Sequence, residues 1–251
     1  MNLLKDNIPK LLRSLAIPAS IGTLFQTLYN IVDTYFAGKI SSDALSALAK
    51  SFPIYFILIA ASVGVTVGGT SLIANSIGEK NRENILRYFG QTIIYGIILS
   101  ILVTIVGLLF ASEIFALMGS TIKVINLGLK YTNVIFSGSV IFISVVALNS
   151  LLHAEGDTKT FRNVLILSFF LNIILNPLFI FGYGFVPALG VAGIGYATIL
   201  VNILGVILIL LKVLKSKRIK NLSIKYFLPN TNLLKKLFFQ SAPISAALLL
   251  I

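Results

Sequence analysis

Three kinds of residue that soluble enzymes commonly use are rare or missing in this sequence. It has no cysteine, no tryptophan and a single histidine, and only 11% of its 251 residues are charged. The missing cysteines exclude disulfides, cysteine metal sites and cysteine nucleophiles. A soluble domain of this length carries about a quarter charged residues, so this chain cannot cover its own surface with polar groups.

Hydrophobic residues make up 57% of the chain and gather in long runs. A run of about 20 apolar residues can cross a bilayer core of roughly 30 Å as a helix, whereas a membrane β-barrel would show short alternating segments. The sequence therefore predicts an all-α, polytopic membrane helical bundle. Six spans and the start of a seventh are expected, at residues 10–38, 47–78, 88–111, 125–152, 163–184, 189–211 and 236–251.

Positive charge is distributed unevenly between the predicted connectors. Sixteen of the 20 Lys and Arg residues fall at the N-terminus (Lys5 among them) or in the second, fourth and sixth connectors, and four fall on the other side. Loops rich in Lys and Arg stay in the cytoplasm, so the N-terminus and the basic linker 212–235 are expected on that side of a plasma or inner membrane. The net charge of +12 is thus a topology signal, and nucleic acid is not an expected partner.

A weak internal repeat relates the start of the chain to its end. "KLLRSLAIPAS" (10–20) aligns with "KKLFFQSAPIS" (235–245) at an offset of 225, with four identical residues in eleven. The chain stops about 16 residues into an apolar run. We therefore expect a six-helix lobe (1–211), a cytoplasmic linker (212–235) and the truncated start of a second lobe (236–251).

One acidic residue stands inside a predicted span. Asp33 lies in "LYNIVDTYFAG" (28–38), while the other seven acids fall in loops or near segment ends. Gln26, Asn30 and Asp33 share one helical face, so the carboxylate belongs to a polar stripe. A charge inside the bilayer costs about 2.5–3.5 kcal/mol on insertion scales and usually faces a cavity. The alternative is a structural Asp33 that hydrogen-bonds its neighbours or reaches the interface.

Two later spans repeat this polar spacing. Ser168, Asn172 and Asn176 lie four residues apart in the fifth span, and Thr198 and Asn202 do so in the sixth. If these faces converge with that of the first span, they line an internal cavity. Hydrogen bonding between helices is an equal alternative for the two fifth-span asparagines, and a structural role is favoured for the sixth-span pair. The residues expected to line the cavity are Gln26, Tyr29, Asn30, Ser168 and Asn202.

Other motifs favour structural roles. Gly64 and Gly68 form a GxxxG pair, which lets helices approach closely, and Pro18 and Pro53 are expected to bend their spans. The stretch "HAEGD" (153–157) contains the only histidine, in a short connector without a second one, so it does not predict a metal site. HExxH, GxSxG and phosphate-binding glycine motifs are all missing from the sequence. Neither an enzyme nor an organic cofactor is therefore expected.

Three stretches together resemble the multidrug and toxic compound extrusion (MATE) family of transporters. They are "IPASIGTLFQTLYNIVDTYFAGKISSDALSALA", "LLHAEGDTKTFRN" and "LNIILNPLFIFGYGFVPALGVAGIGYAT". The resemblance covers essentially the whole chain and implies twelve helices in two pseudo-symmetric lobes, of which this chain would supply the first lobe and part of helix seven. It also implies export of organic, often cationic or amphipathic, compounds in exchange for H⁺ or Na⁺.

The resemblance implies roles for single residues as well. Asp33 stands where the family has its coupling aspartate, Asn172 matches a fifth-helix asparagine, and Thr198 is similar in place to a sixth-helix cation-site threonine. Where some relatives have an aspartate, this chain has Asn176. The loss of that carboxylate places Na⁺ binding by Asp33 and Asn172 in question, and H⁺ and Na⁺ both remain open as coupling ions.

The expected mechanism is alternating access, with a bend of the first helix near Pro18 and Gly22 as the hinge. Three rival functions stay open. A flippase for lipid-linked precursors would need basic side chains in the cavity to hold pyrophosphate. A truncated half-transporter would be inactive alone or would serve as a partner subunit. An enzyme ranks last, because no catalytic constellation is present.

Overall fold

The long apolar runs form helices over most of the chain. The computed structural model describes residues 7–250; Lys5 and Ile251, which belong to the predicted N-terminal and seventh segments, lie outside the described residues. The helices of the described part are α1 (Ile8–Ile40), α2 (Ser42–Gly78), α3 (Arg82–Leu117), α4 (Ile122–Ser137), α5 (Ser139–Ala154), α6 (Lys159–Phe181), α7 (Val191–Val213) and α8 (Thr231–Leu249).

The predicted fold class is confirmed. α1, α2, α3, α6 and α7 are long and apolar enough to cross a membrane, and α4 with α5 forms a sixth, bent span. The predicted ends of the fifth and sixth spans were wrong by two or three residues. α6 stops at Phe181 because Gly182 adopts a positive φ of 76°, a conformation that suits glycine and ends a helix.

The fourth span, predicted as one segment (125–152), is broken at Gly138 and bent there by 44°. A break frees backbone carbonyls, which need donors inside a membrane protein. Thr104 of α3 supplies one, since its hydroxyl donates to the carbonyl of Phe136 at 2.8 Å. The Ser139 hydroxyl lies 2.5 Å from that of Thr104 and donates to the carbonyl of Ser100 at 2.9 Å. The bend is therefore held by hydrogen bonds to α3.

Several helices begin at capping residues that the sequence provides. A side chain at the residue before the helix accepts a hydrogen bond from the backbone N–H three residues later, which satisfies one of the free donors of the first turn. The capping residues are Ser41 for α2, Asn81 for α3, Thr121 for α4 and Asn230 for α8. These caps explain why α2 and α3 start about five residues before the predicted spans.

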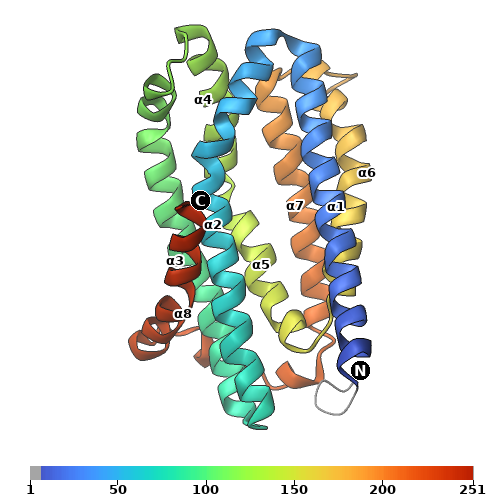
Figure 1. Cartoon of the computed structure of the whole chain (residues 1–251), viewed down its shortest axis with the longest axis vertical. Helices are drawn as coiled ribbons and strands as arrows, with labels where there is room; N and C mark the ends of the chain where they lie inside the picture. Colours follow the sequence, from blue (N-terminus) through green and yellow to red (C-terminus); the bar gives the residue numbers. More distant parts are fainter. Residues whose placement is uncertain (1–6, 251) are drawn as a thin grey trace.

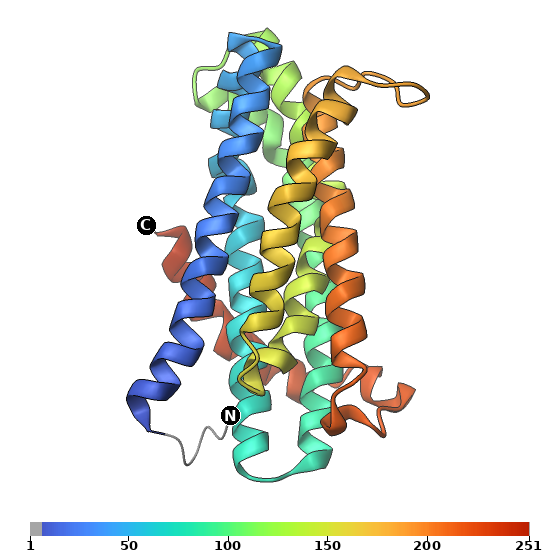
Figure 2. The same ribbon diagram turned by 90° about the vertical axis from the view of Figure 1, so that its right-hand side faces the viewer.

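Helix α2 lies at the centre of the bundle and packs against α3, α4, α5 and α8, while α1 packs mainly against α6. Figure 2 shows α1 and α6 running side by side, with the loop 182–190 at one end of the bundle. At the opposite end lie the start of α1, the α2–α3 turn, the α5–α6 turn and the linker after α7 (Figure 1). The connectors that were assigned to one side by their charge are thus gathered at one end.

The linker between α7 and α8 is bound to α3 by one buried amide. Gln91, which is 2% exposed, donates from Nε2 to the carbonyls of Tyr226 and Leu228 at 2.9 and 2.7 Å. Its Oε1 accepts the backbone N–H of Asn230 at 2.9 Å. One side chain thus satisfies three main-chain groups within five residues of the linker, immediately before α8 begins.

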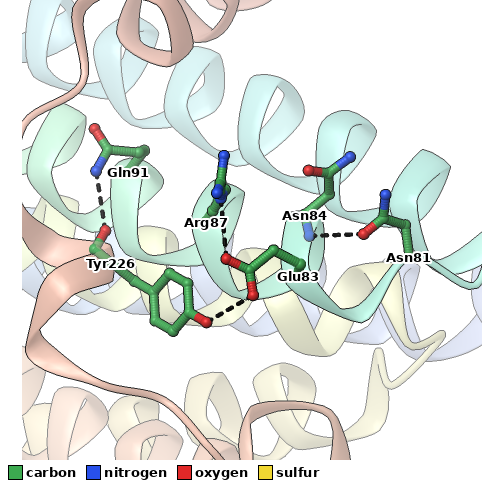
Figure 3. Close-up of polar contacts among 6 residues, drawn as sticks. All are labelled: Asn81, Glu83, Asn84, Arg87, Gln91 and Tyr226. Carbon is green, nitrogen blue, oxygen red and sulfur yellow. Dashed lines mark hydrogen bonds and ion pairs between the residues drawn. The ribbon is translucent and has the colours of Figure 1, made fainter.

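Residues of α3 near Gln91 also contact this segment of the linker (Figure 3). Glu83 accepts a hydrogen bond of 2.8 Å from the Tyr226 hydroxyl and pairs with Arg87 at 3.2 Å. Gly90 leaves room for the linker, because a methyl group there would lie 2.3 Å from the Tyr226 carbonyl oxygen. The linker is therefore bound at a defined position on the N-terminal part of α3.

Replacing Gln91 should destabilise the fold strongly. In Gln91→Leu, two carbonyls and one N–H of the linker lose their partners, and we expect the free energy of unfolding to fall by about 2–4 kcal/mol. Thermal or SDS unfolding of the purified chain in detergent measures it. The control Arg87→Gln removes only an exposed ion pair and should cost less than about 1 kcal/mol. Equal losses in both variants would contradict the assignment.

Candidate functional site

Three polar stripes meet on the inside of the bundle, around a cavity of about 380 Å³. The α1 stripe, the α6 stripe and the α7 pair all reach this cavity, and α2, α4 and α5 complete its wall. All five residues expected to line a cavity do so: Gln26, Tyr29, Asn30, Ser168 and Asn202. Residues three or four positions apart lie on the same face of a helix, so the polar side chains of each helix point in one direction.

Asp33 lies at the edge of this cavity and is bound by α6. It is 5% exposed, and its Oδ1 accepts hydrogen bonds from Asn172 Nδ2 at 2.9 Å and from Asn176 Nδ2 at 2.7 Å. The two amides also bond to each other at 3.1 Å. Both asparagines are fully buried, so the carboxylate has charge-compatible donors in a dry environment. The structure thus brings three of the four predicted cation-site residues together.

The fourth residue, Thr198, lines the same cavity, but its hydroxyl donates to the carbonyl of Ile194 in its own helix at 2.9 Å and not to the carboxylate. Asn202 in turn donates to the carbonyl of Thr198 at 2.8 Å. The polar groups of α7 are therefore satisfied locally. They face the cavity without holding Asp33.

Two polar atoms near Asp33 have no hydrogen-bond partner in the described part of the chain. They are Oδ1 of Asn176 and the hydroxyl of Tyr29, which lies near Thr198 and Asn172 but does not reach hydrogen-bond geometry with either. Buried polar atoms without partners are uncommon in folded proteins. The site therefore keeps a free acceptor beside a carboxylate.

Sequence reasoning missed the contribution of α2 and α4 to the site. Tyr55 of α2 and Tyr131 of α4 line the cavity and lie close enough to Asp33 to interact with its charge. Ser62 and Thr66 of α2 also line it. Their spacing of four residues is the signal that marked the other stripes, but serines and threonines are common in membrane helices and bond to their own backbone, as both do here.

The predicted hinge residues lie away from the cavity lining. Pro18 is buried inside a continuous α1. Gly22 sits against α6, where a methyl group would lie 3.1 Å from Leu165 Cδ1. Gly22 therefore belongs to the contact between α1 and α6. Pro53 likewise lies within an unbroken α2.

The "HAEGD" stretch has structural partners. Glu155 accepts a hydrogen bond from Ser216 at 2.5 Å and lies 3.5 Å from Arg218. Partial burial acts to raise the pKa of Asp157, but hydrogen bonds from Thr160 and the charge of Lys212 outweigh it and hold the pKa below its ordinary value. Within residues 7–250, no group of three or more His, Cys, Asp or Glu side chains could hold a metal ion. These acids tie the α5–α6 turn to the linker and to α7.

Comparison with known proteins gives a consistent result. The MatE family model matches residues 18–178. A probable multidrug resistance protein of Bacillus subtilis, YoeA, is 29% identical over 219 residues, which cover 85% of this chain and 47% of that protein. An FAD transporter of Shewanella oneidensis is 26% identical over 197 residues, covering 78% of this chain and 44% of that protein.

A solved structure described as the outward-facing conformation of a multidrug resistance MATE family transporter of the MOP superfamily has the same arrangement. It superposes with a TM-score of 0.86 at 30% identity, over 98% of this chain and 54% of that one. The chain thus spans about half the length of the proteins that it matches.

The hydrogen bonds to Asp33 predict a contrast between two nearby variants. Asn172→Ala removes a donor from a buried carboxylate and should lower the free energy of unfolding by about 1.5–3 kcal/mol. Tyr29→Phe removes a hydroxyl that has no partner and should change it by less than about 0.5 kcal/mol. SDS unfolding of both variants at neutral pH measures the difference. A Tyr29→Phe loss as large as that of Asn172→Ala would refute the geometry.

Proposed function

Because the chain belongs to the MATE family, we propose that it is the first six-helix unit of a secondary active antiporter. The antiporter would export organic, cationic or amphipathic compounds from the cytoplasm in exchange for a coupling cation. The grouping of the basic connectors at one end of the bundle supports a cytoplasmic N-terminus in the plasma membrane. The partner would be a second six-helix unit, as the length of the relatives suggests.

The observation that carries the proposal is the setting of Asp33. It is an almost fully buried acid beside a cavity that no Lys or Arg lines among the described residues. A carboxylate kept in a membrane interior without a basic partner costs stability. A buried carboxylate at this position is explained if its negative charge is neutralised and restored during each transport cycle. Asp33 would then be the coupling residue, and Asn172 and Asn176 would hold it in place.

The donors around Asp33 favour H⁺ over Na⁺ as the coupling ion. Hard cations bind oxygen ligands, whereas Asn172 and Asn176 both turn N–H groups to the carboxylate. Two amide rotations would be needed to offer oxygens to Na⁺. A proton needs one acceptor only, and Oδ1 of Asn176 is free. Rotation of that single amide would let a protonated Asp33 donate to it, at the cost of the bond to Asn172.

The rival functions are less well supported. A flippase for lipid-linked precursors needs basic side chains for pyrophosphate, and so would a carrier of FAD, the compound in the name of the Shewanella relative. The described cavity lining has an acid and amides instead. A half-transporter that is inactive alone remains compatible with the length of the relatives. It is distinguished by comparing the chain with and without a second unit.

Replacing Asp33 should abolish coupled efflux. We expect Asp33→Asn to reduce gradient-driven export of a fluorescent organic cation at least tenfold, because a neutral amide is not protonated near neutral pH and has no negative charge for a coupling cation to neutralise. The assay uses proteoliposomes that contain the chain alone or the chain joined to the C-terminal half of a MATE relative. Asp43→Asn is the matched control, since Asp43 pairs with Lys123 at the outer turn and not in the cavity. Full efflux in Asp33→Asn would refute the proposal.

The choice of ion has its own test. In the transport-competent assembly, a pH gradient should drive efflux, and a Na⁺ gradient of equal driving force at uniform pH should not. Asn176→Asp adds an oxygen ligand and a charge, and we expect it to raise Na⁺-driven efflux relative to the parent chain. Efflux that follows Na⁺ alone in the parent chain would overturn the assignment of H⁺ and leave the role of Asp33 intact.

A further inference from the structure

A second pocket, of about 300 Å³, lies where the linker crosses the N-terminal part of α3. Arg87 and Gln91 of α3 line one side of it, and Lys225 and Leu228 of the linker line the other. We call it the linker pocket. Among the described residues, it shares no lining residue with the cavity at Asp33. The linker pocket belongs to the end of the bundle where the basic connectors gather (Figure 1).

Several hydrogen-bond acceptors in the wall of the linker pocket already have donors. The carbonyls of Tyr226 and Leu228 accept from Gln91. The carboxylate of Glu83 accepts from the Tyr226 hydroxyl through one oxygen and from Arg87 Nε through the other (Figure 3). A ligand that enters the pocket therefore meets acceptors that are in use, and the groups left for it are mainly donors.

Two basic side chains supply these donors. Arg87 bonds to Glu83 through Nε alone, so its two Nη groups have no partner within residues 7–250. Lys225 makes no ion pair in the same part of the chain, and its Nζ lies 4.8 Å from the centre of the Tyr226 ring. Glu83, Arg87 and Lys225 are the charged residues of the lining, which gives the pocket one net positive charge. A guanidinium beside an ammonium is a donor set that suits phosphate.

The sequence of α3 places Arg87 at the level of the lipid head groups. Residues 88–112 carry no charged side chain, and this length is enough to cross the bilayer core as a helix. Arg87 is therefore the last charged residue of α3 before the hydrocarbon. Close to it in the linker, Leu228 is 66% exposed and Ile224 is 84% exposed. Exposed apolar side chains within a basic segment are typical of a segment that lies in the membrane interface.

The charge of the linker favours contact with an anionic membrane surface. Residues 212–236 contain eight Lys and Arg residues and no Asp or Glu. Basic segments next to a membrane helix are attracted to the anionic lipids of the cytoplasmic leaflet. This attraction is long-range and selects no single lipid. The linker pocket adds a place in which one head group can be held.

We propose that the linker pocket binds the phosphate of an anionic phospholipid from the cytoplasmic leaflet. The Nη groups of Arg87 and the Nζ of Lys225 donate to the phosphate oxygens, and the acyl chains leave the pocket along Leu228. The bound lipid then joins α3 to the linker, in addition to the bonds of Gln91. The inference depends on the membrane setting of the bundle and not on the transport function.

A free phosphate group in the cytoplasm would meet the same donors. The lipid fits better because the pocket wall continues into the exposed apolar side chain of Leu228, which a small anion does not need. The position of Arg87 next to the uncharged part of α3 points the same way. The two sources of phosphate are separated by experiment.

The absence of tryptophan allows a single reporter to be placed at the linker pocket. The chain with Leu228→Trp is reconstituted into vesicles of phosphatidylcholine with a minor share of phosphatidylglycerol, and one of the two lipids at a time carries bromine, a short-range quencher of tryptophan. We expect brominated phosphatidylglycerol to quench about threefold more per mole than brominated phosphatidylcholine, because choline brings a positive charge toward Lys225. Equal quenching by the two lipids would overturn the proposal.

Charge-matched variants separate the linker pocket from the general attraction of the linker. Arg87→Gln with Lys225→Gln should abolish the preference for phosphatidylglycerol. Arg82→Gln with Lys220→Gln removes the same charge from α3 and the linker, but neither residue lines the pocket, so the preference should remain. Loss of the preference in both pairs, or in neither, would overturn the assignment of the pocket.

Three further measurements complete the test. Lys225→Arg keeps the charge and should keep the preference, whereas Lys225→Gln alone, at an exposed position that the fold does not need, should weaken it. A reporter at the other end of α3, Leu117→Trp, which is 86% exposed, should show no preference. Inorganic phosphate, compared with chloride at equal ionic strength, should leave the quenching unchanged. Relief of quenching by phosphate alone would show that the pocket takes a free anion, and would overturn the assignment of a lipid.

Discussion

The hydrogen bonds from Asn172 and Asn176 to Asp33 are the interaction on which this half of the bundle depends. A carboxylate buried at membrane depth is removed from bulk water, so the protein must supply most of its hydrogen-bond donors. Because the donors lie on α6, the need to solvate one charge fixes α1 to α6. α1 is otherwise largely exposed. The position of the cavity follows, since α1 forms one of its walls.

The need of buried polar groups for hydrogen-bond partners within the protein also explains two features elsewhere in the fold. The break at Gly138 is held in place because Thr104 donates to the carbonyl of Phe136 and Ser139 donates to the carbonyl of Ser100, which link the broken span to α3. The linker keeps one path because Gln91 bonds to its main chain at three points. In both places a single polar side chain of α3 decides the course of a neighbouring segment. Helix α3 thus organises the bundle although it contributes nothing to the described cavity lining.

Much of the fold and part of the site could be predicted from the sequence, because both depend on local spacing. Apolar runs set the spans, and a spacing of four residues placed Asn172 and Asn176 on the face that meets Asp33. Tyr55 and Tyr131 could not be found in this way, since an aromatic residue in an apolar span looks the same whether it faces lipid, core or cavity. Gly138 was missed for a related reason: a glycine breaks a helix only where neighbours such as Thr104 stabilise the break.

The hydrogen bonds between Gln91 and the linker constrain the order in which the fold can assemble during synthesis of the chain. Its partner Tyr226 is 135 residues further along the chain, so the ribosome completes four later helices before the amide can be satisfied. Until then the emerging bundle carries an uncapped polar group at the end of α3. Docking of the linker on α3 is therefore a late step in the assembly of this fold, because the contact cannot form before Tyr226 has been synthesised.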